Sequence, residues 1–283
     1  MYIDSYHTMK EDNDYTFVGD NSRQDELYMG FELEVDEVPA GEDSGDWEED
    51  NESSVYECTE EIANATPENL PEDFLHFEED GSLESGFEMI SQPASLSQHL
   101  TNLAPHGFYD RIGRICSSYG FTSHDNGRCG LHIHLDKAFF GKSLDSASAK
   151  LLFLFERHWD NLYKFSRRRS AHWCHRYVEN SGYRTRDARG GQTVKLKEII
   201  DDAKDHCIDR YFAVNLSNDN TIEIRLWRGT LNRTTLLATF KLTARLAQLA
   251  KDTPAVKLAA MSWKDILGDD PDILAYASTR GLL

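Results

Sequence analysis

The sequence lacks paired cysteines. Its 283 residues contain five cysteines, at positions 58, 116, 129, 174 and 207, and no two of them show the spacing Cys-x-x-Cys. An odd number without that spacing argues against a disulfide framework and against a structural zinc site. We therefore expect a protein of the reducing cytoplasm.

Long apolar runs and recognisable leader segments are absent as well. No stretch approaches the ~18 consecutive apolar residues that cross a bilayer, and the start Met-Tyr-Ile-Asp-Ser-Tyr lacks the basic and apolar parts of a signal peptide. These observations predict no membrane span. The sequence also has no Gly-x-x-x-x-Gly-Lys loop, which excludes a P-loop nucleotide site.

Basic residues are missing from one long segment. Residues 24–110 contain 25 of the 49 acidic residues and no Lys or Arg, so the remainder holds 49 − 25 = 24 acidic and 30 basic residues, a net charge of +6. The formal net charge of −19 therefore belongs to one segment. It argues against a nucleic-acid partner, although less strongly than a uniformly acidic surface would.

The N-terminal third suggests two regions outside the core. Residues 1–28 are polar and predict an N-terminal extension, ahead of a single domain over 29–283. Residues 36–61 carry 12 acidic and no basic residues. Such a composition buries little apolar surface, so we expect a flexible or partly ordered insertion. The alternative is an insert for protein contact or substrate specificity.

What the sequence does contain is a set of strands with one charged face. In residues 129–135, His132 and His134 alternate with three aliphatic residues, a period of two that is typical of a half-buried strand. Residues 31–35 (Phe-Glu-Leu-Glu-Val) and 222–226 (Ile-Glu-Ile-Arg-Leu) repeat the pattern. If three such strands share one sheet, their charged side chains gather on one face and their apolar side chains face helices.

The remaining pattern favours an α+β fold. Residues 74–91 predict a hairpin around Asp80-Gly81, and residues 210–228 predict a second hairpin around 218–220. Helices are expected over 95–119 with a break near 105–107, over 144–165, and from Asn232 or Thr234 to about Lys251. Hairpins imply antiparallel pairing, which argues against a doubly wound parallel sheet.

The charged faces offer ligands for a hard divalent cation. Glu32 and Glu34 stand side by side, and adjacent carboxylates repel unless a cation or a proton lies between them. Glu88 and Glu223 add further carboxylates, and oxygen ligands with an occasional imidazole suit Mg²⁺ or Mn²⁺. Any one of these glutamates, taken alone, is equally explained as a solvated strand position.

Arginines and one asparagine accompany the acidic strands. Arg225 shares a face with Glu223 and has the planar fork that recognises phosphate or carboxylate, whereas alternation sends Arg228 to the other face unless a bulge intervenes. Ion pairing with the acidic segment is the alternative for both. Basic residues 167–169 follow a helix and suit its C-terminal dipole or a phosphate, and Asn215 is either a buried strand residue or a ligand contact.

Several of these stretches, taken in order, resemble the amidoligase family, of the carboxylate–amine ligase superfamily that includes glutamine synthetase and glutamate–cysteine ligase. The resemblance covers roughly residues 29–245. It rests on these motifs: Phe-Glu-Leu-Glu-Val at 31–35, Asp80-Gly81-Ser82-Leu83 with Phe87-Glu88-Met89-Ile90-Ser91 and Pro93, Cys129-Gly130-Leu131-His132-Ile133-His134, Val214-Asn215-Leu216, and Thr221-Ile222-Glu223-Ile224-Arg225 with Arg228-Gly229-Thr230-Leu231.

The resemblance implies a curved antiparallel sheet, a half-barrel like that of glutamine synthetase, with helices on its convex face. It implies an ATP-dependent ligase that joins a small-molecule or peptide carboxylate to an amine. One Mg²⁺ or Mn²⁺ would be held by Glu34 and Glu88, and a second by Glu32, His132 and Glu223. His134, Arg169, Asn215 and Arg225 would contact the nucleotide or substrate, with His134, Arg225 and Arg228 in catalytic roles.

Two other functions compete with this interpretation. One is a metal-dependent hydrolase that uses the histidines and carboxylates without ATP, and the other is a non-enzymatic binding module that uses the acidic segment. The arginines near Glu223 count against the hydrolase, because hydrolysis of a neutral bond does not need them. The sequence does not specify either substrate or the oligomeric state.

Overall fold

The computed structural model describes residues 3, 15–37, 48–124, 127–177 and 211–283, and for residues 48–53 it describes the backbone alone. The chain divides into two compact units, each formed by three separate segments. The first unit contains residues 1–20, 28–132 and 228–237, and the second contains residues 21–27, 133–227 and 238–283. The expectation of a single domain over 29–283 stays a prediction.

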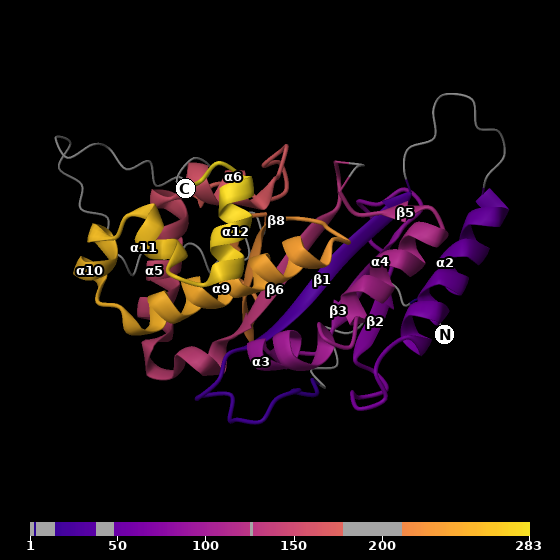
Figure 1. Cartoon of the computed structure of the whole chain (residues 1–283), viewed down its shortest axis with the longest axis horizontal. Coiled ribbons are helices and arrows are strands. Elements are labelled where there is room, and N and C mark those ends of the chain that lie inside the picture. The colour runs from indigo at the N-terminus through magenta and orange to yellow at the C-terminus, as the bar shows by residue number, and fades with distance from the viewer. Residues whose placement is uncertain (1–2, 4–14, 38–47, 125–126, 178–210) are drawn as a thin grey trace. The chain divides into compact units, whose positions relative to one another are not determined.

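The first unit combines a sheet with helices (Figure 1). Strand β1 neighbours β3 and β6, and β3 neighbours β2. The elements of this unit are β1 (Tyr28–Glu37), α2 (Glu48–Asn64), β2 (Leu75–Glu78), β3 (Phe87–Ser91), β4 (Ala94–Ser95), α3 (Leu96–Gln98), the π-helix η1 (His99–Leu103), α4 (Phe108–Ser118), β5 (Phe121–Thr122) and the start of β6 (Gly130–Asp136).

The register of this sheet separates charge from apolar surface. Strand β3 pairs antiparallel with β1 and β2, which sets Glu34 opposite Glu88 and Leu33 opposite Met89. Cross-strand partners share a face, and neighbours along a strand point to opposite faces. The carboxylates therefore lie on one face and the aliphatic side chains on the other, so the predicted alternation and the antiparallel α+β fold are confirmed.

The apolar face of the first unit is fully excluded from solvent. Leu33, Val35 and Met89 are at most 1% exposed. Phe87 meets Phe77 and Phe121 edge to face, with ring centroids 5.8 and 5.4 Å away. Burying one such side chain contributes roughly 1.5–3 kcal/mol, so this face supplies much of the energy that holds the carboxylate strands in place.

Part of the acidic segment forms a helix. Residues 48–64 form α2, which contacts α4, and the two helices lie side by side in Figure 1. The side chains of Cys58 and Ile62 on α2 are completely buried, so α2 packs on the first unit through this small apolar face. Residues 38–47 of the predicted insertion lie outside the described residues.

The described part of the predicted N-terminal extension makes hydrogen bonds with later parts of the chain. In the first unit the backbone of Val18 donates to the Pro93 carbonyl over 2.9 Å and the Thr16 amide donates to Gln92 Oε1 over 3.0 Å. In the second unit Arg23 makes two hydrogen bonds of 2.7 Å to the Asp136 carboxylate. Residues 1–2 and 4–14 lie outside the described residues.

The second unit is built from the rest of β6, two further strands and most of the helices (Figure 1). Strand β8 neighbours β6 and pairs antiparallel with β7. The elements are the 3-10 helix η2 (Lys137–Ser143), α5 (Leu144–Arg157), α6 (Trp159–Ser166), β7 (Val214–Asn215), β8 (Thr221–Arg228), α9 (Arg233–Asp252, which begins in the first unit), α10 (Ala255–Ala260), α11 (Trp263–Leu267) and α12 (Pro271–Thr279).

One predicted helix is broken in two. The periodicity over 144–165 predicts one helix, but α5 ends before His158 and α6 begins after it, with φ −109° and ψ 23° at His158. The backbone hydrogen bonds continue on both sides of the break: the His158 amide donates to the Leu154 carbonyl, and the His158 carbonyl accepts from the Leu162 amide. The apolar stripe continues across this residue, so the spacing of apolar residues cannot reveal the break.

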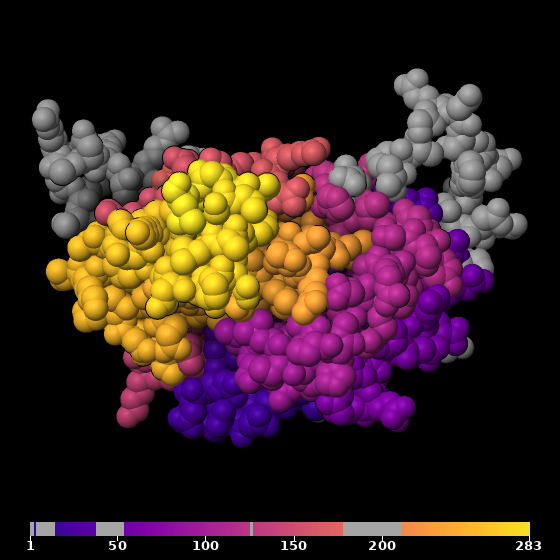
Figure 2. All heavy atoms as spheres, in the orientation of Figure 1, coloured from indigo at the N-terminus to yellow at the C-terminus, as the bar shows by residue number. Residues whose placement is uncertain are grey.

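The helix predicted from Asn232 or Thr234 to about Lys251 is confirmed as α9. Asn232 caps it by accepting the Thr235 amide over 3.0 Å, as an N-cap side chain should. Further along, Tyr276 of α12 packs edge to face on Phe165 of α6 at 4.7 Å. The C-terminal residues form part of the visible surface of the second unit (yellow in Figure 2). No helix in the described ranges is long and apolar enough to cross a membrane.

A buried histidine ties η1 to β1 in the first unit. His99 is completely buried, its Nε2 lies 3.3 Å from the Met29 carbonyl and its Nδ1 lies 2.5 Å from the Tyr109 hydroxyl. Since a carbonyl only accepts, Nε2 donates and Nδ1 accepts from the tyrosine. Burial lowers the pKa of His99 from 6.5 to about 4, so the native imidazole is neutral at physiological pH.

This histidine predicts a pH-dependent loss of stability. Between pH 6.5 and about 4 the unfolded chain binds a proton at His99 that the native protein does not bind. The contribution of His99 to the free energy of unfolding is therefore complete above pH 6.5, and it falls by about 3 kcal/mol as the pH drops from 6.5 to about 4. Denaturant unfolding of His99→Gln should show a shallower dependence on pH than the wild type. The exposed His106→Gln is the control, and equal slopes for His99→Gln and wild type would refute the prediction.

Candidate functional site

In the first unit, His132 of β6 lies between the two glutamates of β1. Its Nδ1 is 3.0 Å from Glu32 Oε2 and its Nε2 is 3.6 Å from Glu34 Oε1. The Gly130 amide donates to Glu34 Oε2 over 2.5 Å. A carboxylate only accepts, so Nδ1 carries the proton in the contact with Glu32, and a neutral ring then presents its lone pair at Nε2.

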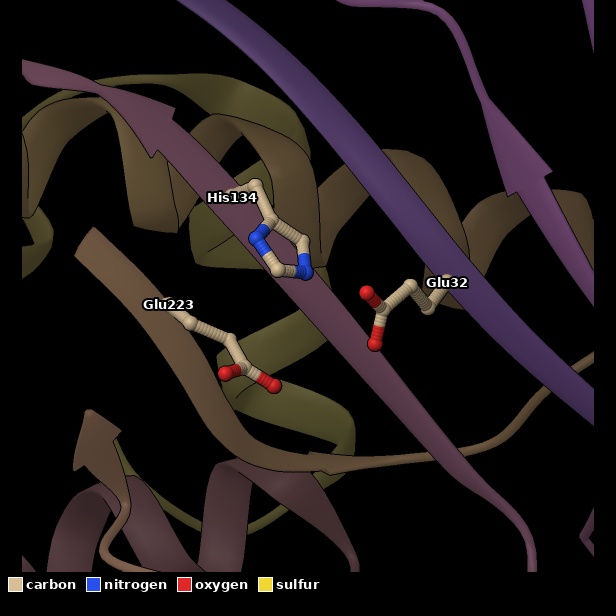
Figure 3. Close-up of side chains that lie close together, drawn as sticks. All are labelled: Glu32, His134 and Glu223. Carbon is tan, nitrogen blue, oxygen red and sulfur yellow. The ribbon is translucent and has the colours of Figure 1, made fainter. Parts of the chain in front are cut away.

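Glu88 of β3 joins Glu32 and His132 to form a buried set that could share one ion. Glu32, Glu88 and His132 each offer a ligand atom, and these atoms lie within 4.8 Å of one another. All three residues are 3% exposed, and Glu32 extends from β1 as drawn in Figure 3. Carboxylate oxygens with one imidazole suit Mg²⁺ or Mn²⁺. We call this set the carboxylate–histidine cluster.

In the second unit, Glu223 of β8 is held by three donors. Its Oε2 accepts from the amides of Asn215 over 2.8 Å and Asn218 over 3.2 Å, and its Oε1 accepts from the Arg225 guanidinium. The carboxylate is 2% exposed. Figure 3 draws it as it extends from β8. Asn215 is buried and orients Glu223, and its contact with a ligand stays a prediction.

His134 belongs to the second unit, although His132, two residues earlier, belongs to the first. Its Nδ1 lies 3.0 Å from the Thr221 hydroxyl, and the ring extends from β6 in Figure 3. A ligand atom of Glu223, in the same unit, lies within 4.8 Å of a ring nitrogen of His134. The separate roles that the family resemblance implies for the two histidines stay predictions.

Comparison with known proteins identifies the family. A family model described as "Putative amidoligase enzyme" matches residues 8–247. The chain belongs to the amidoligase family. The match contains every candidate residue named above.

Among solved structures, one titled "Crystal structure of novel glutamine synthase homolog" is similar at 12% identity and a TM-score of 0.38, over 90% of this chain and 63% of that one. This chain therefore spans less than two thirds of the length of that protein. No curated protein matches the sequence.

The arginines of the amidoligase differ in their surroundings. Arg225 is half-buried, contacts Glu223 and lies 5.7 Å from the ring of Tyr211. Arg228, also half-buried, is the last residue of β8 and belongs to the first unit. Of the basic run after α6, Arg169 is exposed. The sequence thus located Arg225 beside a carboxylate, and the roles of all three arginines stay predictions.

Arg168 was not singled out by sequence analysis. It is buried, and its guanidinium donates to the carbonyls of Leu226 over 3.4 Å and Arg225 over 3.2 Å. It therefore supports the strand that carries Arg225. The preceding Arg167 adopts a left-handed conformation with φ 62° at the end of α6, which turns the chain there. Sequence gives no signal that separates one arginine of such a run from the next.

Glu78 is a second residue that sequence analysis missed. It is completely buried and lies opposite Glu88 in the β2–β3 register, as Glu34 does in the β1–β3 register. Its Oε1 is 3.3 Å from His76 Nε2. Three carboxylates thus form a row across three strands. The repeated Phe-Glu of the two hairpin strands was the available signal, but the long connection between them hides the register.

The cysteines near these residues do not act as nucleophiles. Cys129 is 2% exposed and Cys174 is completely buried, and burial raises the pKa of the Cys174 thiol although Arg168 and Arg225 lower it in part. A thiol is reactive as the thiolate, so a raised pKa makes it inert. Cys58, Cys116, Cys129 and Cys174 are free thiols, whereas Cys207 lies outside the described residues.

The carboxylate–histidine cluster predicts that metal binding depends on Glu88. Added Mn²⁺ should raise the melting temperature of the wild type, and that of Glu88→Gln should stay unchanged, because the substitution removes one of the three ligands. The exposed Glu68→Gln should respond to Mn²⁺ like the wild type. A Glu88→Gln protein whose melting temperature still rises with Mn²⁺ would contradict this prediction.

Proposed function

We propose that this amidoligase is an ATP-dependent carboxylate–amine ligase that forms an amide or isopeptide bond through an acyl phosphate and requires Mg²⁺ or Mn²⁺. The observation that carries the proposal is the carboxylate–histidine cluster. Its three buried ligands are of the kind that a hard divalent cation prefers. Family membership supports the amide-forming part of the proposal.

The need for ATP follows from the chemistry of the substrate. A carboxylate is a poor electrophile and does not condense with an amine in water. In the first step a carboxylate oxygen attacks the γ-phosphorus of ATP and ADP leaves. In the second step the amine nitrogen attacks the acyl carbon, the bond to phosphate breaks, and the nitrogen loses a proton. Phosphoryl transfer of this kind depends on positioning and on charge stabilisation.

The residues of the first unit would hold the cation. Glu32, Glu88 and His132 are the ligands of the carboxylate–histidine cluster, and Glu34 lies beside them through its contact with His132. A bound divalent cation would neutralise phosphate charge. The predicted pairing of Glu34 with Glu88 stays a prediction, and the cluster supports an arrangement in which Glu32 and His132 would join Glu88 at one ion.

The residues of the second unit would act on the phosphates and the substrate. Glu223 would supply a ligand to a second cation, the Arg225 guanidinium would stabilise the transferring phosphoryl group or bind the carboxylate, and His134 would donate a hydrogen bond to phosphate. We assign supporting contacts to Asn215 and Arg169, and a catalytic role to Arg228, which belongs to the first unit. The substrates proposed are a small-molecule or peptide carboxylate and an amine.

The reaction predicts a double requirement for substrates. Purified protein with ATP and Mg²⁺ should release ADP only when a carboxylate and an amine are both present, which coupled ADP detection across a panel of amino acids, peptides and polyamines can measure. Turnover of an amide without ATP would instead favour the metal-dependent hydrolase. A complete lack of ADP with either Mg²⁺ or Mn²⁺ across the panel would count against the ligase.

The assigned residues predict a loss of ligand binding without unfolding. Calorimetric titration with a non-hydrolysable ATP analogue and Mg²⁺ should show affinity reduced by at least about tenfold in His132→Ala and in Glu223→Ala, because each change removes a ligand whose loss is worth about 1.4 kcal/mol or more. Circular dichroism should show both variants folded. The control is His106→Ala, which changes an exposed histidine. Wild-type affinity in both site variants would exclude these residues as ligands.

A further inference from the structure

The turn between β7 and β8 is held by one lysine. Lys137, the residue that follows β6, directs its ammonium at three carbonyl oxygens of the turn: Leu216 at 3.5 Å, Asp219 at 3.3 Å and Asn218. Its own backbone amide donates to the Asn220 carbonyl over 3.0 Å. An ammonium has three protons to donate and no acceptor, so three carbonyls match its donors.

The side chain of Asn218, in this turn, is linked by hydrogen bonds to Glu223 and, through one hydroxyl, to His134. The Asn218 amide donates to Glu223 Oε2 over 3.2 Å and to the Thr221 hydroxyl over 3.4 Å. That hydroxyl lies 3.0 Å from His134 Nδ1. Asn218 therefore touches Glu223 directly and His134 through Thr221.

We propose that Lys137 and Asn218 are positioning residues: Lys137 fixes the backbone of the β7–β8 turn, and Asn218 transmits this order to Glu223 and His134. The inference rests on the proposed function of those two side chains. A glutamate has several freely rotating bonds, and donors that fix its carboxylate in advance reduce what ligand binding must order. Residues that orient a ligand-binding group typically change affinity ten- to hundredfold when they are lost.

The charge of Lys137 is essential to this arrangement. Methionine has a similar length and flexibility but no donor, so Lys137→Met would leave three carbonyls of the turn to seek water or to turn away. The change leaves Glu223, His134 and Asn218 intact. Any effect on ligand affinity must then pass through the conformation of the turn.

The full-length chain offers a matched control. Lys150 of α5, also in the second unit, donates to the Ala250 carbonyl over 2.8 Å. Lys150→Met therefore removes a lysine–carbonyl hydrogen bond of the same kind at another place. Asn218→Ala separates the two parts of the proposal, because it keeps the lysine contacts of the backbone and removes the side chain that touches Glu223.

The test compares hydrogen exchange and ligand affinity in full-length variants. Without metal, Lys137→Met should exchange amide hydrogens at residues 217–221 at least about tenfold faster than wild type, whereas Asn218→Ala and Lys150→Met should not. The affinity for a non-hydrolysable ATP analogue with Mn²⁺ should fall about tenfold or more in Lys137→Met and Asn218→Ala at an unchanged fold, and stay at the wild-type value in Lys150→Met.

The outcomes separate this inference from the proposed function. Wild-type exchange of the turn in Lys137→Met would overturn the role of Lys137, even if the wild type binds the analogue. Faster exchange with wild-type affinity in both Lys137→Met and Asn218→Ala would overturn the transmission to Glu223 and His134. If the wild type binds no nucleotide, the proposed function fails, and the exchange of the turn still decides whether Lys137 fixes it.

Discussion

The pairing of β1 with β3 is the constraint on which the first unit depends. A period of two leaves no intermediate register: a shift by one residue would turn Leu33 and Val35 towards the charged side and bury Glu32 and Glu34 among aromatic rings. The apolar contacts of Phe87 and Met89 resist that shift. The energy that fixes the core thus also fixes the distances among the carboxylates, which lie on the opposite face of these strands.

The candidate carboxylates of the two units are arranged differently. In the second unit, Glu223 accepts hydrogen bonds from two side-chain amides and one guanidinium. In the first unit, Glu78, Glu88 and Glu34 form a row across three strands, with His76 beside Glu78 and His132 beside Glu34. The donors around Glu223 stabilise its negative charge, whereas several carboxylates close together are an arrangement that a divalent cation stabilises.

Sequence alone predicted those features that follow from a local period. The strands around Glu32, His132 and Glu223 and the cap at Asn232 are set by alternation and by short-range hydrogen bonding, and the structure confirms them. The row that includes Glu78 depends on the register of a hairpin with a long connection, and no local pattern specifies that register. The break at His158 interrupts no apolar stripe, so the sequence contains no sign of it.

The candidate site was predictable in its residue types and less so in its grouping. Alternation placed Glu32 and Glu34 on one face, but which carboxylate joins His132 depends on side-chain geometry that the sequence does not encode locally. Supporting residues were the hardest to predict. Lys137 and Arg168 act through backbone carbonyls far away in the sequence. Every residue has a backbone carbonyl, so the sequence does not indicate which one a side chain will contact.

The interleaving of the two units has a consequence for how this chain can change during evolution. Each unit is formed by three separate segments, and the chain passes from one unit to the other inside β6, inside β8 and within α9. No single cut yields either unit as a continuous piece. Recombination, which exchanges continuous stretches of a gene, therefore cannot transplant one unit as a module. The side chains of the His-x-His motif must instead diverge together, one point mutation at a time, within a single inherited chain.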